Sequence, residues 1–101
     1  MRLKDEIMIN EDGRIIDLKY YILEEPLAEC SDIIMYGVKI EMTEEFGGEI
    51  KNFEKTVHAM FTKPESIENF VRLIIENTVT PTTLENVAEE YVDKKLYYHS
   101  A

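Results

Sequence analysis

The stretch "TKPESIENFVRLIIENTVTPTTLENVAEEYV", residues 62–92, decides the fold, because apolar residues recur through it at helical spacing. A first apolar stripe along one helical face comprises Ile67, Phe70, Val71, Ile74 and Ile75. A second stripe with the same spacing comprises Leu84, Val87, Ala88, Tyr91 and Val92. Pro81 lies between the two stripes and disfavours helical backbone angles at Thr80. We therefore expect two amphipathic helices separated by a short break.

Signals for both ends of the first helix flank its apolar stripe. Thr62 and Glu65 have the spacing of a capping box, and Pro64 lies in the first turn, where no backbone donor is needed. Thr78 and the two residues after it are poor helix formers, so this helix should end near Asn77.

The start of the second helix has two interpretations. Either Thr80 caps it with Pro81 at the first helical position, or Thr82 caps it with Glu85 three residues further on. Capping needs only one or two of the three threonines, so Thr82 and Thr83 form a hydroxyl-rich corner with no assigned structural role. This corner is a candidate binding edge.

Upstream of this stretch the apolar residues alternate at period two, which is typical of half-buried antiparallel strands. The alternation predicts four strands, near residues 6–10, 14–25, 33–42 and 50–61. Asp12-Gly13 is a hairpin signal between the first two strands, because both residues tolerate the positive φ of a tight turn. Gly47-Gly48 supplies the same freedom before the fourth strand.

Two residues inside these runs constrain the sheet. Pro26 removes a backbone donor, so the second strand should end near Glu25. Gly37 has no side chain to pack in the third strand, and we expect a helix to cross above it. Strands first and helices second indicate an α+β fold, an antiparallel four-stranded sheet (β-β-β-β-α-α) with two C-terminal helices packed on one face. The length fits a single α+β domain, residues 1–101.

The formal net charge is −10, and acidic residues outnumber basic ones both before and after Thr62. Such a surface repels phosphate backbones, so we expect no direct nucleic-acid binding. A DNA-reading helix-turn-helix is also disfavoured, because the second helix would turn Glu85, Glu89 and Asp93 toward the phosphates. The negative charge has two interpretations. It keeps the protein soluble, or it allows the surface to mimic a nucleic acid or to bind a basic partner.

The compartment is indicated by cysteine usage and by the amino terminus. A lone cysteine, Cys30, excludes an intramolecular disulfide and suggests a reducing compartment. Residues 1–10 are too charged for a signal peptide, and no apolar run approaches the ~20 residues of a membrane span. We expect a cytoplasmic protein that does not contact a membrane.

Residues able to carry chemistry are few. His58 and His99 are the only histidines, and neither has the neighbours that a zinc site requires. Cys30 with His58 is the one formal nucleophile–base pair, and no motif supports it. We therefore predict no catalytic, cofactor-binding or metal-binding residues, no cofactor and no enzymatic activity.

Two strings, "YGVKIEM" at residues 36–42 and "NTVTPTTLENVAEEYV" at residues 77–92, carry a resemblance. Together they resemble a family of uncharacterised proteins of about a hundred residues from spore-forming anaerobic bacteria, a domain of unknown function. The resemblance implies a bacterial, cytoplasmic protein with the architecture described above. It implies no catalytic or binding residues, because the family has none assigned.

The function that remains is a small non-enzymatic interaction or regulatory module, which binds a protein partner or a second copy of itself as a homodimer. The sheet face away from the helices carries more apolar residues than a solvated face needs, namely Ile15, Tyr21, Leu23, Ile33 and Met35. Together with the hydroxyl-rich corner and the last aromatic residues, this gives six candidate interaction residues: Tyr21, Met35, Thr82, Thr83, Tyr97 and Tyr98.

Two alternatives belong to other classes of protein. The first is an acidic inhibitor that mimics nucleic acid on a basic protein. The second is a small enzyme or ligand binder that uses a groove between sheet and helices. The second requires Cys30 or His58 to line a concave pocket with converging polar groups.

Overall fold

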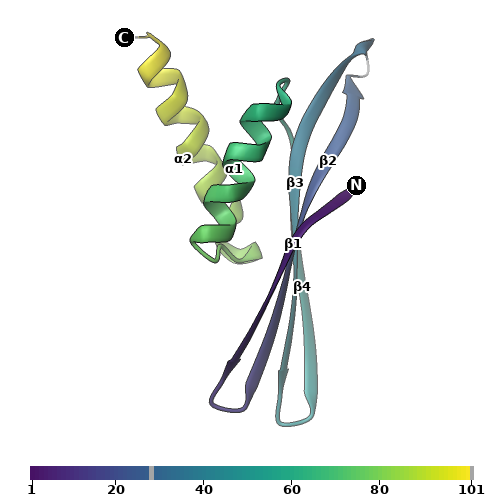
Figure 1. Cartoon of the computed structure of the whole chain (residues 1–101), viewed down its shortest axis with the longest axis vertical. Coiled ribbons are helices and arrows are strands. Elements are labelled where there is room, and N and C mark those ends of the chain that lie inside the picture. The colour runs from purple at the N-terminus through teal and green to yellow at the C-terminus, as the bar shows by residue number, and fades with distance from the viewer. Residues whose placement is uncertain (28, 101) are drawn as a thin grey trace.

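The computed structural model describes residues 1–27 and 29–100, without the side chains of residues 30, 31 and 94–100. The elements are β1 (Arg2–Glu11), β2 (Arg14–Leu27), β3 (Cys30–Phe46), β4 (Glu49–Phe61), α1 (Pro64–Glu76) and α2 (Pro81–Ser100). The four strands form one antiparallel sheet in the order β1-β2-β3-β4, and both helices contact it (Figure 1). The predicted α+β fold is confirmed.

Both tight turns use the residues that the sequence marked for them. Asp12 and Gly13 have φ of 52° and 80°, and they connect the paired residues Glu11 and Arg14. Gly47 and Gly48 have φ of 60° and 83° in the β3–β4 hairpin. Positive φ at both central residues is the geometry that lets a two-residue turn follow the twist of its strands.

The second strand continues further than Pro26 suggested. It extends to Leu27, and Pro26 pairs with Ile34 of β3. The expected end near Glu25 is therefore wrong. The physical reason is that β1 begins opposite Ile22, so beyond that point β2 has a neighbour on one side only. A residue that lacks an N–H is tolerated where the strand is an edge.

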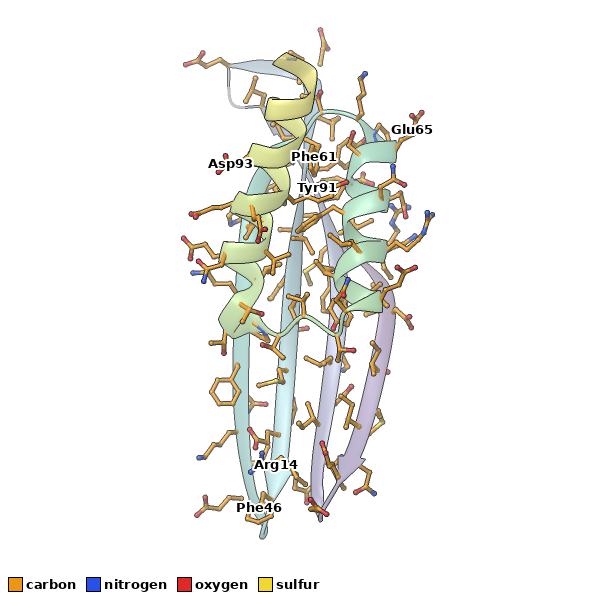
Figure 2. The ribbon with its side chains drawn as sticks, turned by 90° about the vertical axis from the view of Figure 1, so that its left-hand side faces the viewer. Arg14, Phe46, Phe61, Glu65, Tyr91 and Asp93 are labelled. Atoms are coloured by element: carbon orange, nitrogen blue, oxygen red, sulfur yellow. The ribbon has the colours of Figure 1, made fainter. Side chains whose placement is uncertain are left out.

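The core lies between one face of the sheet and the two helices. Alternate residues of β2 and β3 point into it, and both predicted helical stripes meet them. The buried apolar residues are Leu18, Tyr20, Ile22, Val38, Ile40, Ile67, Phe70, Val71, Ile74, Val79, Leu84 and Ala88. In Figure 2, Phe61 and Tyr91 point into the space between the helices and the sheet, and their rings meet edge to face at 6.0 Å.

The first helix begins one residue later than the capping box predicted. Lys63, and not Thr62, occupies the N-cap position, and it makes no side-chain capping hydrogen bond. Pro64 occupies the first helical position, as expected for a residue without a donor. The capping-box interpretation of Thr62 and Glu65 is therefore wrong.

The break between the helices is a tight C-terminal cap on α1. The N–H of Thr78 donates to Ile75 O at 3.1 Å, and the N–H of Val79 donates to Ile74 O at 2.9 Å. This is the Schellman pattern, in which the residue after the helix cap is left-handed and is most often glycine. Here it is Thr78, with φ of 50°. The buried Tyr20 hydroxyl donates to the carbonyl oxygen of Val79 at 2.9 Å, which fixes this break to the sheet.

The second helix starts at Pro81, directly after Thr80. The first interpretation of its start is therefore correct in position, and Thr82 is not the cap. The carbonyl oxygen of Thr80 accepts the backbone N–H groups of Thr83 and Leu84. The Thr83 hydroxyl lies 3.5 Å from the same oxygen, so part of the unexplained hydroxyl corner belongs to this turn.

Gly37 is covered by the backbone of β4 and not by a helix. Tyr36 pairs with Phe61 and Val38 pairs with Val57, so residues 58–60 bulge opposite Gly37. A Cβ atom at Gly37 would clash with the carbonyl oxygen of Val57. The expected helix crossing above Gly37 is wrong, because a bulge of the neighbouring strand is what requires the glycine.

Candidate interaction surfaces

The two helices cover only one half of the sheet (Figure 1). The other half consists of the ends of the two hairpins, residues 8–16 and 43–53, here called the distal hairpins. Large apolar side chains are exposed there, with exposed fractions from 36% to 66%: Met8, Ile15, Phe46, Ile50 and Phe53. The distal hairpins thus present apolar area without the cover that the rest of the sheet has.

These apolar side chains lie on both faces of the distal hairpins. Phe53 pairs with Met42, which pairs with the core residue Leu18, so Phe53 lies on the face that the helices cover further along. Ile50 pairs with Glu45, which pairs with Ile15, and these residues lie on the opposite face. A partner could therefore contact the distal hairpins from either side.

A polar clasp stabilises the tip of the distal hairpins. Arg14 Nε lies 3.0 Å from Glu44 Oε1, and its guanidinium carbon lies 5.5 Å from the centre of the Phe46 ring. Arg14 belongs to the first hairpin, whereas Glu44 and Phe46 belong to the second. The clasp therefore ties the two hairpins together, and Figure 2 shows Arg14 and Phe46 at the end of the molecule far from Phe61 and Tyr91.

The open face of the sheet is more polar near its centre than the sequence predicted. A hydrogen bond to Glu41, together with desolvation, raises the pKa of Tyr21 to about 12. Lys39 Nζ lies 3.9 Å from Glu41 and 3.4 Å from Glu54. Tyr21 and Met35 are both half-buried on the open sheet face. Tyr21 thus borders a network of charged side chains, whereas Met35 pairs with Glu25 further along the sheet.

The same face holds a pair of carboxyl groups. A hydrogen bond with Asp17 raises the pKa of Glu6 above its ordinary value, and desolvation and the charge of Asp17 act in the same direction. Asp17 Oδ1 is buried, and it has no hydrogen-bond partner among the described residues. The pair therefore makes the protonated form of Glu6 more favourable in the folded protein than in a free side chain.

The other candidate residues are scattered. Thr82 and Thr83 are exposed at the start of α2. Tyr97 and Tyr98 belong to the last turns of α2, and their side chains lie outside the described part of the structure. Among the candidates whose side chains are described, Thr82 and Thr83 lie on α2, whereas Tyr21 and Met35 lie on the sheet.

A groove of about 490 Å³ lies between the β4 edge of the sheet and α2. Its strand side is formed by residues 55–60, and its helix side by Glu85, Ala88, Glu89, Val92 and Asp93. Lys55 Nζ contacts Glu85 Oε2 at 2.9 Å across the groove. A groove between sheet and helices was expected only as an alternative, and the sequence could not place it, because nothing in the residue pattern shows that α2 lies along β4.

His58 lines this groove, but its imidazole also reaches across the sheet. Its Nδ1 lies 2.6 Å from Glu25 Oε1, and the two side chains are 64% and 50% exposed. Gly37 lies on the strand between them and offers no side chain to block the contact. The suggested pairing of His58 with Cys30 involves a side chain outside the described residues. In the described part of the chain, no three His, Cys, Asp or Glu side chains group as a metal site.

A family model described as "Family of unknown function (DUF6514)" matches residues 3–94. The chain belongs to this family. The resemblance to a family of uncharacterised proteins is thereby confirmed. No curated protein and no solved structure matches the chain. Among the described residues of this DUF6514 member, no helix is long and apolar enough to cross a membrane.

Proposed function

We propose that this DUF6514 protein is a small non-enzymatic, cytoplasmic interaction module whose distal hairpins contact another protein or a second copy of the chain. The observation that carries the proposal is the exposed apolar area on both faces of the hairpins, where Ile50 on one face and Phe53 on the other are 62% and 41% exposed. Several large exposed apolar side chains close together on a small protein mark a contact surface. The single cysteine fits a reducing compartment.

The shape of this surface favours a protein over a small ligand. Hollows of about 100 and 420 Å³ lie beside Arg14 and Phe46. The larger hollow is lined mainly by charged side chains, those of Glu11, Asp12 and Arg14, whereas pockets for small ligands are lined mainly by apolar ones. Large apolar side chains exposed on both faces of the hairpins are better suited to another protein surface.

The non-enzymatic assignment is supported by the exposure of the chemistry-bearing pair. His58 and Glu25 contact each other while at least half of each side chain faces solvent. Acid–base and electrostatic catalysis depend on a site from which water is largely excluded. The pair therefore suits a surface contact better than a catalytic centre.

Two substitutions and a control test the proposal. Phe53→Lys and Ile50→Lys each place a charge on one face of the distal hairpins, while Leu73→Lys places it on α1, where Leu73 is 36% exposed. We expect size-exclusion chromatography with light scattering to give a mass above 11.8 kDa for the wild type, or affinity capture to retain a defined protein. At least one hairpin variant should lose that contact, and Leu73→Lys should keep it.

The contrary result is equally clear. A wild-type monomer that captures the same proteins as both hairpin variants would show that the distal hairpins contact nothing. Melting temperatures of the three variants serve as the folding control, because exposed substitutions usually change stability by about 0.5 kcal/mol or less.

A further inference from the structure

The outer edge of β4 is an unpaired sheet edge. In the strand order β1-β2-β3-β4, β4 has β3 on one side only. The carbonyl oxygen of Val57 faces Gly37 of β3. Backbone groups of successive residues in an extended strand point in opposite directions, so the N–H and C=O of Thr56 point away from β3. Thr56 therefore offers a donor and an acceptor at the free edge.

A helix runs beside this edge and makes it a groove. Figure 2 shows α2 lying along the outer strands of the sheet, with Asp93 on the side away from α1. The floor of the groove is apolar, with Met60 from the strand and Ala88 and Val92 from the helix. The bulge at residues 58–60 interrupts the regular strand, which limits a new ladder to the part of the edge around Thr56.

The helix side of the groove is an acidic row. Glu85, Glu89 and Asp93 are spaced four residues apart, so they lie on one face of α2, and all three are exposed. Each step of four residues advances about 6 Å along a helix. Alternate side chains of an extended strand are about 6.7 Å apart. The acidic row thus nearly matches the spacing of side chains on one face of an extended peptide.

We propose that this groove binds an extended, basic segment of another protein, which adds to β4 as a fifth strand. The backbone of the segment pairs with the edge at Thr56. Lysine or arginine side chains at every second position meet Glu89 and Asp93 of the acidic row, since Glu85 already contacts Lys55 across the groove. The aliphatic stems of the same side chains cover the floor at Ala88 and Val92, because the alternate residues face away from α2. Strand addition to a sheet edge beside a helix is an established mode of peptide recognition.

The charge of the groove decides between occupants. A second copy of this chain would bring its own acidic row and a net charge of −10 to the same edge. A nucleic acid would meet the acidic row with its phosphates. Of the three occupants, only a basic peptide is attracted by the acidic row and also forms hydrogen bonds with the free backbone groups. The acidic row on α2 lies outside the distal hairpins, so variants of the row test this site without changing the exposed apolar residues that carry the proposed function.

A synthetic peptide provides the probe. It is fluorescein-labelled, alternates lysine and valine over about eight residues, and is titrated with the whole protein at low salt. A peptide alternating glutamate and valine is the charge control. Two further lysine–valine peptides carry N-methyl groups, one on every lysine and the other on every valine, so that each has lost the donors of one edge.

Strand addition predicts a specific pattern of binding. The lysine–valine peptide should bind with a Kd below about 1 mM, and the glutamate–valine peptide should not bind. Exactly one of the two N-methylated peptides should bind about tenfold more weakly or worse, because only one edge of the peptide faces β4. No binding by the lysine–valine peptide, or equal binding by both methylated forms, would overturn the proposal.

Variants of the protein locate the site. The double substitution Glu89→Gln with Asp93→Asn should weaken binding about fivefold, while Glu65→Gln with Glu76→Gln on α1 lowers the net charge equally and should leave it unchanged. Hydrogen exchange at the Thr56 amide should slow when the peptide is bound. Equal weakening by both double variants, or an unchanged Thr56 amide, would show that the peptide binds by charge alone and elsewhere.

Discussion

At the scale of single residues, Thr78 is under backbone strain. Its φ of 50° lies in the left-handed region, which a β-branched residue rarely adopts. Thr78→Gly should therefore raise the free energy of unfolding by about 0.5–1 kcal/mol. Urea denaturation of the wild type, Thr78→Asn and Thr78→Gly should place asparagine between the other two. A loss of stability in Thr78→Gly would mean that the Schellman cap is not formed.

Tyr20 connects the break between the helices to the sheet. Its hydroxyl donates to the buried carbonyl of Val79, so Tyr20→Phe leaves this oxygen without that donor. The expected loss is about 1–3 kcal/mol of unfolding free energy. Tyr21→Phe on the half-buried open face is the matched control and should cost less. Equal losses in the two variants would argue against a buried bond at Val79.

The bulge in β4 requires a glycine at position 37. Gly37→Ala introduces a Cβ atom against backbone atoms of Val57 and 3.1 Å from the Cα of His58. Because backbone atoms yield little, we expect a loss of about 1–3 kcal/mol, seen as a drop of several degrees in melting temperature. Ala59→Gly in the bulge, where φ is 52°, should not destabilise the protein. A neutral Gly37→Ala would show that the bulge relaxes freely.

Glu6 makes stability depend on pH. Its pKa is raised in the folded protein, chiefly by the hydrogen bond with Asp17. Folding therefore favours the protonated form, and that stabilisation is present below the unfolded pKa of 4.5 and is lost as the pH rises through the folded pKa. Glu6→Gln should match the wild type at acid pH and exceed it in stability at neutral pH. Glu11→Gln is the control, and an identical pH profile for both variants would contradict the assigned pair.

At the scale of elements, helices and turns were the most predictable parts. Most residues of the two apolar stripes are buried as expected, while Ile75, Val87 and Tyr91 are half-buried against the core and Val92 lines the groove. Asp12-Gly13 and Gly47-Gly48 form the turns. The capping box predicted at Thr62 was wrong because Pro64 occupies the first helical position, which makes Lys63 the N-cap residue. A proline at this position favours the start of a helix without a side-chain cap. Local chemistry predicts elements best where a residue's backbone restriction decides the conformation.

The strand ends and Gly37 were not predictable for a different reason. Whether Pro26 can remain in a strand depends on where β1 begins, and whether Gly37 faces a helix or a bulge depends on the register of β4. Both are properties of a neighbouring strand. The residue pattern within one strand contains no information about its neighbour's register.

At the scale of the whole molecule, length explains where the candidate surface lies. The helices α1 and α2, of 13 and 20 residues, are about 20 and 30 Å long, whereas the longest dimension of the protein is 48 Å. Helices of this length cannot cover strands of 13 to 17 residues. The lengths of the helices and strands could therefore have predicted exposed hairpin ends. The alternation of apolar residues alone predicted the apolar patch on the open face of the sheet instead.

The central claim is that the distal hairpins contact a protein. The most direct measurement places a photo-crosslinking phenylalanine derivative at Ile50, at Phe53 or at Leu73 in cells of the native host, followed by mass spectrometry of the crosslinked species. The account predicts a defined crosslinked species from position 50 or 53, either a partner or a second copy, and none from position 73. The claim would be contradicted if neither position 50 nor position 53 gave a crosslinked species, or if all three positions gave the same one.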